Sequence, residues 1–184
     1  MAKVVAGMTI SLDGFVEDAS GGVAALYPDF EAMHDYPSLQ ESIARTGAVI
    51  MGRRTFGMGD SEWYDENYEY QGPIFIVTHQ PPVPPPRAGG KITLTFVTDG
   101  IESAVAQAKA AAGDKDVTVV GGANTIQQLL RAGLVDELEM DVMPVLLGSG
   151  LRFFDHLEGA GVTLEKIFVR ESGIRTHLRF RVVK

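Results

Sequence analysis

The stretch VVGGANTIQQLL, residues 119–130, joins an apolar run, two adjacent glycines and an amphipathic segment. Glycine weakens both strands and helices, so Gly121 and Gly122 require a reason. One reason is a tight turn from strand to helix, which glycine's backbone freedom permits. The other is a phosphate site, where missing side chains let a nucleotide approach the backbone and the N–H groups that begin the helix. The residues of this stretch are compatible with both.

Apolar segments rich in β-branched residues recur along the rest of the chain and predict buried strands. They cover residues 3–10, 48–52, 73–78, 92–97 and 117–120. Amphipathic segments separate several of them, and after residue 119 the helix buries Ile126, Leu129 and Leu130. The alternation of strand and helix predicts a largely parallel sheet.

Several residues predict where helices begin and end. Pro37 divides the helix-like segment 30–47, and Gly47 is its expected stop. Asp99 and Glu102 resemble a capping box, and Gly113 is expected to end the helix that follows.

Near the C-terminus, two segments carry alternating charges of opposite sign. In DELEMDV (136–142) the acidic residues Glu137, Glu139 and Asp141 alternate with apolar ones, which predicts a half-exposed strand. In IRTHLRFRVV (174–183) one face carries Arg175, His177, Arg179 and Arg181. We expect the two segments to be antiparallel neighbours whose facing charges fix the register, each pair contributing about 0.2–1 kcal/mol. The basic row is therefore interpreted as structural, with a dimer surface as one possible setting, and not as a nucleic-acid surface.

The expected fold class is α/β, with a mostly parallel central sheet, helices on both faces and a C-terminal antiparallel hairpin at one edge. The length of 184 residues suits one domain, residues 1–184. The proline-rich segment 80–90 is interpreted as an excursion between neighbouring strands and not as a domain boundary.

Composition excludes several classes of function. The chain has no cysteine and only four scattered histidines, which argues against a metal centre or a thiol mechanism. A net charge of −8 opposes binding of extended nucleic acid, while a small anion needs only a few local donors. No apolar run approaches the roughly 20 residues that cross a membrane, so we expect a cytoplasmic protein with no membrane partner.

Four stretches, in this order, together resemble the dihydrofolate reductase superfamily. They are the first strand with SLDG (11–14), AVIMGRRTF (48–56), PIFIVTHQPP (73–82), and VVGGANT (119–125) leading into LVDELEMDVMPVLLGSG. The greatest similarity is to stand-alone relatives of the reductase domain of the bifunctional riboflavin-biosynthesis deaminase-reductase. The resemblance implies a three-layer dihydrofolate-reductase-like fold and an NADPH-dependent reductase of a small planar substrate, such as a pteridine or a riboflavin-pathway pyrimidine. A non-catalytic nucleotide-binding or regulatory protein on the same fold is the alternative.

The resemblance assigns the cofactor-binding residues to three turns. NADPH phosphates would contact Gly52, Arg53, Arg54 and Thr55; the 2′-phosphate would lie near Thr78 and His79; the nicotinamide and pyrophosphate would contact Gly121, Gly122, Ala123, Asn124 and Thr125. A cis peptide between Gly121 and Gly122 is implied as well. Family members often have arginine where this chain has Asn124, so NADPH would be held less tightly or would compete with NADH.

The general acid has two candidates in this chain. The resemblance places a carboxylate near Asp29, in YPDF, and Asp13, in SLDG, is its rival. Each is equally compatible with a turn or helix-cap aspartate.

The aromatic loop SEWYDENYEYQG, residues 61–72, has two interpretations. Trp63 and Tyr64 could stack on a flat substrate, or the aromatic residues could anchor the loop to the core or to a second subunit. We expect a homodimer that binds a small-molecule substrate.

Overall fold

The computed structural model describes residues 2–59, 64–84 and 86–183. An eight-stranded sheet has the order β5-β4-β3-β6-β1-β7-β10-β9. Its strands are β1 (Val4–Ser11), β3 (Thr46–Gly52), β4 (Pro73–Val77), β5 (Thr93–Val97), β6 (Asp116–Val119), β7 (Glu137–Met143), β9 (Thr163–Ser172) and β10 (Arg175–Val183). A small second sheet pairs β2 (Phe15–Glu17) with β8 (Leu151–Arg152). The helices are α1 (Pro37–Arg45), α2 (Arg53–Phe56), α3 (Ile101–Ala112) and α4 (Ala123–Arg131), with 3₁₀ turns η1 (Ala24–Leu26) and η2 (Ala32–Asp35).

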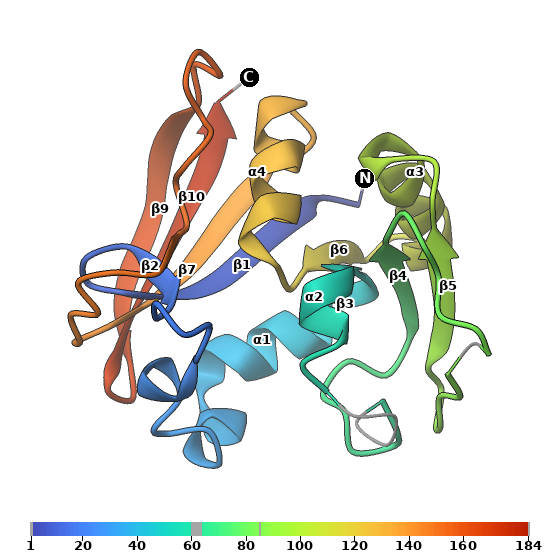
Figure 1. Cartoon of the computed structure of the whole chain (residues 1–184), viewed down its shortest axis with the longest axis horizontal. Coiled ribbons are helices and arrows are strands. Elements are labelled where there is room, and N and C mark those ends of the chain that lie inside the picture. The colour runs from blue at the N-terminus through green and yellow to red at the C-terminus, as the bar shows by residue number, and fades with distance from the viewer. Residues whose placement is uncertain (1, 60–63, 85, 184) are drawn as a thin grey trace.

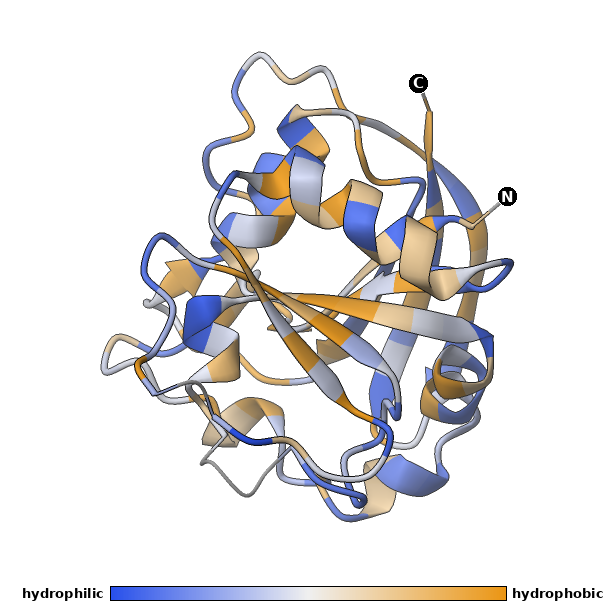
Figure 2. Cartoon of the chain, turned by 90° about the vertical axis from the view of Figure 1, so that its right-hand side faces the viewer, coloured by the Kyte–Doolittle hydropathy of each residue, from blue (hydrophilic) through white to orange (hydrophobic). Residues whose placement is uncertain are grey.

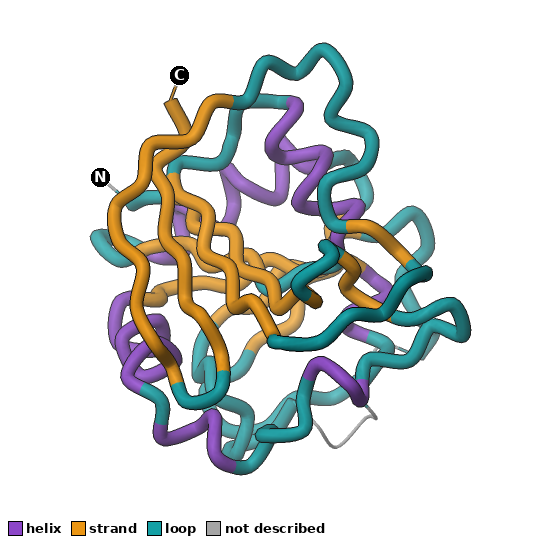
Figure 3. The backbone as a smooth tube through the Cα atoms, turned by 90° about the vertical axis from the view of Figure 1, so that its left-hand side faces the viewer, coloured by secondary structure: helices purple, strands orange, loops and turns teal. Residues whose placement is uncertain are grey.

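The sheet is parallel from β5 through β7 and antiparallel only at its C-terminal end. Strands β9 and β10 form the expected hairpin, which runs along one edge of the molecule (Figure 3). Strands β4 and β5 are parallel neighbours, so the proline-rich segment between them is the excursion that the sequence predicts. The α/β fold class is confirmed.

Helices cover both faces of the sheet because successive residues of each buried strand point to opposite sides. In β3, Ala48 and Ile50 belong to the core beneath α3 and α4, whereas Val49 and Met51 belong to the core on the side of α1. Figure 1 shows α3 and α4 above the strands and α1 below them. Strands β1, β3 and β4 are mainly apolar. The helices carry both apolar and polar residues (Figure 2), as a three-layer arrangement requires.

Two of the predicted helix boundaries are wrong. The N-cap of α3 is Gly100, with a φ of 106°, and no side chain caps the helix, so Asp99 and Glu102 form no capping box. Helix α1 ends at Arg45, and Gly47 already belongs to β3. A Cβ on Gly47 would lie 2.6 Å from the carbonyl oxygen of Ala112, so this glycine allows the close approach of α3 to β3. Gly113 does end α3, with a φ of 63°.

The predicted antiparallel pairing of the two charged strands is confirmed, and acidic and basic residues do face each other across it. His177 lies opposite Asp141, Arg179 opposite Glu139 and Arg181 opposite Glu137. The side chains of Arg179 and Glu137 form an ion pair of 2.5 Å, and His177 Nδ1 lies 2.8 Å from Asp141 Oδ1.

The prediction that β7 is half-exposed is wrong, because Glu137 and Glu139 are buried. Cations from distant segments cover them: Lys3 reaches Glu137, and Arg45, at the end of α1, reaches Glu139. The acidic face of β7 is thus an internal ion network, which explains how alternating charge fits a central strand. Within the described part of the chain, no helix is both long enough and apolar enough to cross a bilayer.

Candidate functional site

The two glycine-containing turns, after β3 and after β6, pack directly against each other. Gly52 N donates to the carbonyl oxygen of Gly121 over 2.8 Å. A Cβ on Gly52 would lie 2.5 Å from Thr125 Oγ1, and one on Gly122 would lie 3.2 Å from Thr55 Oγ1. Each turn therefore needs glycine because a hydroxyl of the other turn occupies the space of a side chain.

Gly121 itself has a φ of 119°, a conformation that favours glycine, and its bond to Gly122 is cis as the resemblance implied. A Cβ on Gly121 would lie 3.1 Å from Met8 Cε and 3.3 Å from Thr55 Oγ1. The two glycines thus join strand to helix and also let this turn pack closely against β1 and the start of α2.

These turns form one wall of a cavity of 770 Å³, a volume typical of small-molecule sites. Most of the residues assigned to the cofactor line it: Gly52, Arg53, Arg54, Thr55, Thr78, His79, Gly122, Ala123, Asn124 and Thr125. Gly121 does not line the cavity, but its carbonyl oxygen accepts the hydrogen bond from Gly52 of this wall. The start of α3, with Thr98, Gly100 and Ile101, lines the same region, although no motif in the sequence indicated it.

The two arginines of this wall differ in their contacts. Arg54 Nη2 lies 2.6 Å from both carboxylate oxygens of Glu17, and its side chain is 65% exposed. Arg53 is exposed and forms no ion pair within the described ranges. An exposed ion pair contributes about 0–1 kcal/mol, so Arg54 can exchange Glu17 for another anion at little cost.

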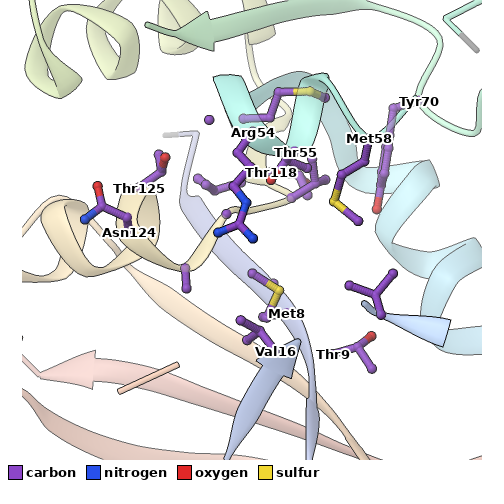
Figure 4. Close-up of a pocket in the computed structure, with 18 of the residues that line it drawn as sticks. Met8, Thr9, Val16, Arg54, Thr55, Met58, Tyr70, Thr118, Asn124 and Thr125 are labelled. Carbon is purple, nitrogen blue, oxygen red and sulfur yellow. The ribbon is translucent and has the colours of Figure 1, made fainter. Parts of the chain in front are cut away.

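The hydroxyl and amide groups nearby are engaged locally. Thr78 is buried, and its hydroxyl donates to the carbonyl oxygen of Gln80 and accepts from the Gln80 N–H. Asn124 Oδ1 accepts from Gln128 over 2.6 Å. Asn124 and Thr125 lie at one side of the cavity, Thr9 and Tyr70 at the other, with Met8 and Arg54 between them (Figure 4).

Neither predicted acid lines the cavity, and each has a structural partner instead. Asp13 accepts from Ser11 Oγ and from the N–H groups of Leu147 and Gly148, which fixes the loop after β7. These hydrogen bonds, led by that from Ser11, lower the pKa of Asp13 to about 2. A carboxyl group with such a pKa is ionised near neutral pH and is a poor proton donor.

Asp29 forms a two-point ion pair with Arg175, over 2.6 and 2.9 Å. The side chains are 8% and 1% exposed, so the pair is buried. The hydrogen bonds from Arg175 lower the pKa of Asp29. The structure thus gives Asp29 the role of anchoring the loop before α1 to β10.

The loop aromatics that the structure describes are anchors. The ring of Tyr64 stacks on Phe56 with centroids 4.7 Å apart, and its hydroxyl donates to the carbonyl oxygen of Phe56. Tyr68 and Tyr70 complete a buried row beside it, so the anchoring interpretation holds for these three, although all three also line the cavity. Trp63 lies outside the described residues.

A group of polar residues also lines the cavity, and we call it the inner end. It consists of Thr9, Tyr27, Glu69, Asp141, Arg175 and His177. Thr9 lies opposite Asp141 on the neighbouring strand, and Asp141 lies opposite His177 on the next, so three strands present one row. Sequence reasoning assigned Asp141, Arg175 and His177 to sheet pairing alone, because alternation does not show which buried positions border a cavity.

Burial sets the ionisation behaviour of this end. It raises the pKa of Tyr27, and the hydrogen bond with Thr9 and the charge of Arg175 offset part of that rise. Burial also raises the pKa of Glu69. Among the described residues, no group of His, Asp and Glu is arranged to hold a metal ion.

Comparison with known proteins gives a consistent result. A family model described as the RibD C-terminal domain matches residues 2–178. The uncharacterised protein YyaP of Bacillus subtilis is 26% identical over 156 residues, which cover 83% of this chain and 80% of that protein.

Two solved structures share the fold over the whole chain. The "putative riboflavin biosynthesis protein" of Shewanella sp. PV-4 has a TM-score of 0.72 and 25% identity, with 100% of both chains covered. The diaminohydroxyphosphoribosylaminopyrimidine deaminase/5-amino-6-(5-phosphoribosylamino)uracil reductase of Thermotoga maritima has a TM-score of 0.71 and 15% identity. That match covers 99% of this chain and 57% of the Thermotoga protein.

Proposed function

The chain belongs to the RibD C-terminal domain family, and from this premise we propose that it is an NADPH-dependent reductase of a small planar heterocycle. The observation that carries the proposal is the packing of the Gly52 and Gly121–Gly122 turns into one wall of the cavity. The wall brings two arginines and the start of α4 together, as binding of a dinucleotide phosphate requires.

The residues present suit such a cofactor. Gly52 and Gly122 let the two turns pack against each other, and both glycines line the cavity beside Arg53 and Arg54. Arg53 and Arg54 would hold phosphate oxygens by charge-assisted hydrogen bonds, and the first N–H groups of α4 would add their dipole. NADPH, when bound, supplies the hydride.

The chain's own contribution is to bind and orient the substrate and to exclude water. The substrate would occupy the space beyond Met8, between the Gly121–Gly122 turn and the inner end (Figure 4). Because Asp13 and Asp29 are held elsewhere, we propose that an ordered water or a carboxyl group of the inner end delivers the proton.

We expect the protein to oxidise NADPH in the presence of a pteridine or an aminopyrimidine substrate. The reaction is measured as the loss of the absorbance of the reduced nicotinamide. Calorimetric titration with NADPH in parallel separates binding from turnover. Binding without turnover on the whole panel would favour a non-catalytic nucleotide-binding protein. Absence of binding would contradict both.

We also propose that the protein is a homodimer, that it acts in the cytoplasm and that it binds no nucleic acid. Strand β9 is at the edge of the sheet and exposes Ile167 by 40% and Val169 by 51%. Exposed apolar side chains on an edge strand favour association with a second copy. The ion pairs of Arg175, Arg179 and Arg181 leave little positive charge free on β10 for a phosphate backbone.

A further inference from the structure

The cation at the inner end is closed to ligands. Arg175 donates through Nε and Nη2 to Asp29, through Nη1 to Thr9 over 2.9 Å, and through Nη2 to the carbonyl oxygen of Leu26 over 3.2 Å. Its side chain is 1% exposed, and the guanidinium lies 5.2 Å from the centre of the Tyr27 ring. Its charge is therefore compensated by Asp29, and most of its N–H groups already have acceptors.

Hydrogen-bond acceptors at the same end remain available. Asp141 Oδ1 contacts His177 Nδ1 at 2.8 Å, and the Asp141 side chain keeps 26% exposure on the wall of the cavity. Within residues 2–59, 64–84 and 86–183, no side chain donates to Asp141 Oδ2 or to the carboxyl group of Glu69. The His177 ring lies tilted beside that of Phe168, with the ring centroids 5.6 Å apart.

The cavity is thus divided by charge. Arg53 and Arg54 line the wall formed by the turns, whereas the inner end presents Asp141 and Glu69 and a neutralised Arg175. A carboxylate accepts two N–H groups from one edge of a ring, and it repels a phosphate that finds no cation nearby. Repulsive groups of this kind are as effective for specificity as attractive ones.

We infer that the inner end selects an unphosphorylated planar ring, whose N–H edge is bound by Asp141 as positioned by His177. This inference rests on the proposed function, since it assigns Arg53 and Arg54 to the cofactor. The inference separates the substrate of this chain from phosphoribosylamino-substituted pyrimidines, which have the same ring but carry a phosphate.

The test compares one ring with and without a phosphate on the wild-type protein. The probes are 5-amino-6-ribitylaminouracil and its 5′-phosphate, titrated calorimetrically with and without saturating NADP⁺. We expect the unphosphorylated compound to bind at least tenfold more tightly. Equal or tighter binding of the phosphate, or no binding of either compound, would overturn the inference.

The second arm uses Asp141→Asn, which keeps the shape of the side chain and removes one acceptor. We expect it to weaken binding of the unphosphorylated compound at least tenfold and to leave NADPH affinity within twofold. Glu165→Gln is the matched control, because this exposed carboxylate pairs with Arg181 away from the cavity and should change neither affinity. Unchanged affinity in Asp141→Asn would also overturn the inference. If the wild-type protein does not bind NADPH, the proposed function is contradicted instead. The titrations without NADP⁺ distinguish this failure from a failure of the inference about the ring.

Discussion

Replacing Asp29 by Asn should lower the free energy of unfolding by about 3–5 kcal/mol, the cost of leaving one partner of a buried ion pair uncompensated. Arg175 would remain inside the protein with its side chain 1% exposed and no carboxylate to balance its charge. The hydroxyl of Tyr36 would also lose the charged form of its acceptor, which lies 3.1 Å away.

The measurement is urea unfolding of three variants beside the wild type. Glu165→Gln breaks the pair with Arg181, whose side chains are 59% and 60% exposed, so its effect should stay below about 1 kcal/mol. The double change Asp29→Asn with Arg175→Met should recover part of the loss, because it removes the buried charge as well. If Asp29→Asn costs no more than Glu165→Gln, the buried pair does not have the role described.

The same pair predicts how stability depends on pH. The hydrogen bonds from Arg175 hold the pKa of Asp29 below its value in the unfolded chain, which is about 3.9. The contribution is therefore complete above the unfolded-state pKa and is lost as the pH falls through the lower folded-state pKa. The difference in unfolding free energy between wild type and Asp29→Asn should accordingly shrink in acid.

The fold could be predicted from the sequence because its signals are local. Alternation within DELEMDV and IRTHLRFRVV, together with the expected fold, predicted an acidic and a basic row on antiparallel neighbours, and the structure pairs Glu139 with Arg179 and Asp141 with His177. Their burial was not predictable in the same way. It depends on Lys3 and Arg45, which lie far away in the sequence and come near only when β1 and α1 pack against the sheet.

In the candidate site, too, local motifs were predictable and contacts between distant residues were not. The turns at Gly52 and Gly121 are short motifs, and their residues do meet at one cavity. The acids could not be judged from motifs, since Asp29 is engaged by Arg175, a residue 146 positions later. The inner end could not be predicted from motifs either, because Thr9, Asp141 and His177 become neighbours only through the strand order β1-β7-β10.

The double change Arg53→Ala with Arg54→Ala should weaken NADPH binding by about a hundredfold to ten-thousandfold. Each charge-assisted contact with phosphate contributes about 1.5–3 kcal/mol, and each 1.4 kcal/mol is about a factor of ten. Arg53 is exposed, and Arg54 is held only by Glu17 at the surface, so both can turn to an anion in the cavity. Affinity should be measured by calorimetry at several salt concentrations, and the variant should depend on salt less steeply than the wild type.

Two further variants isolate the cause of that loss. Arg181→Ala removes an equally exposed arginine that pairs with Glu165 outside the cavity, and it should leave NADPH affinity within twofold. Glu17→Gln removes the competitor of Arg54 and should tighten binding by no more than about fivefold, because an exposed pair contributes about 0–1 kcal/mol. Tighter binding in Glu17→Gln and weaker binding in the double arginine variant are expected together only if Arg54 exchanges Glu17 for phosphate. If the double arginine variant binds NADPH within twofold of the wild type, the wall formed by the turns is not part of the cofactor site.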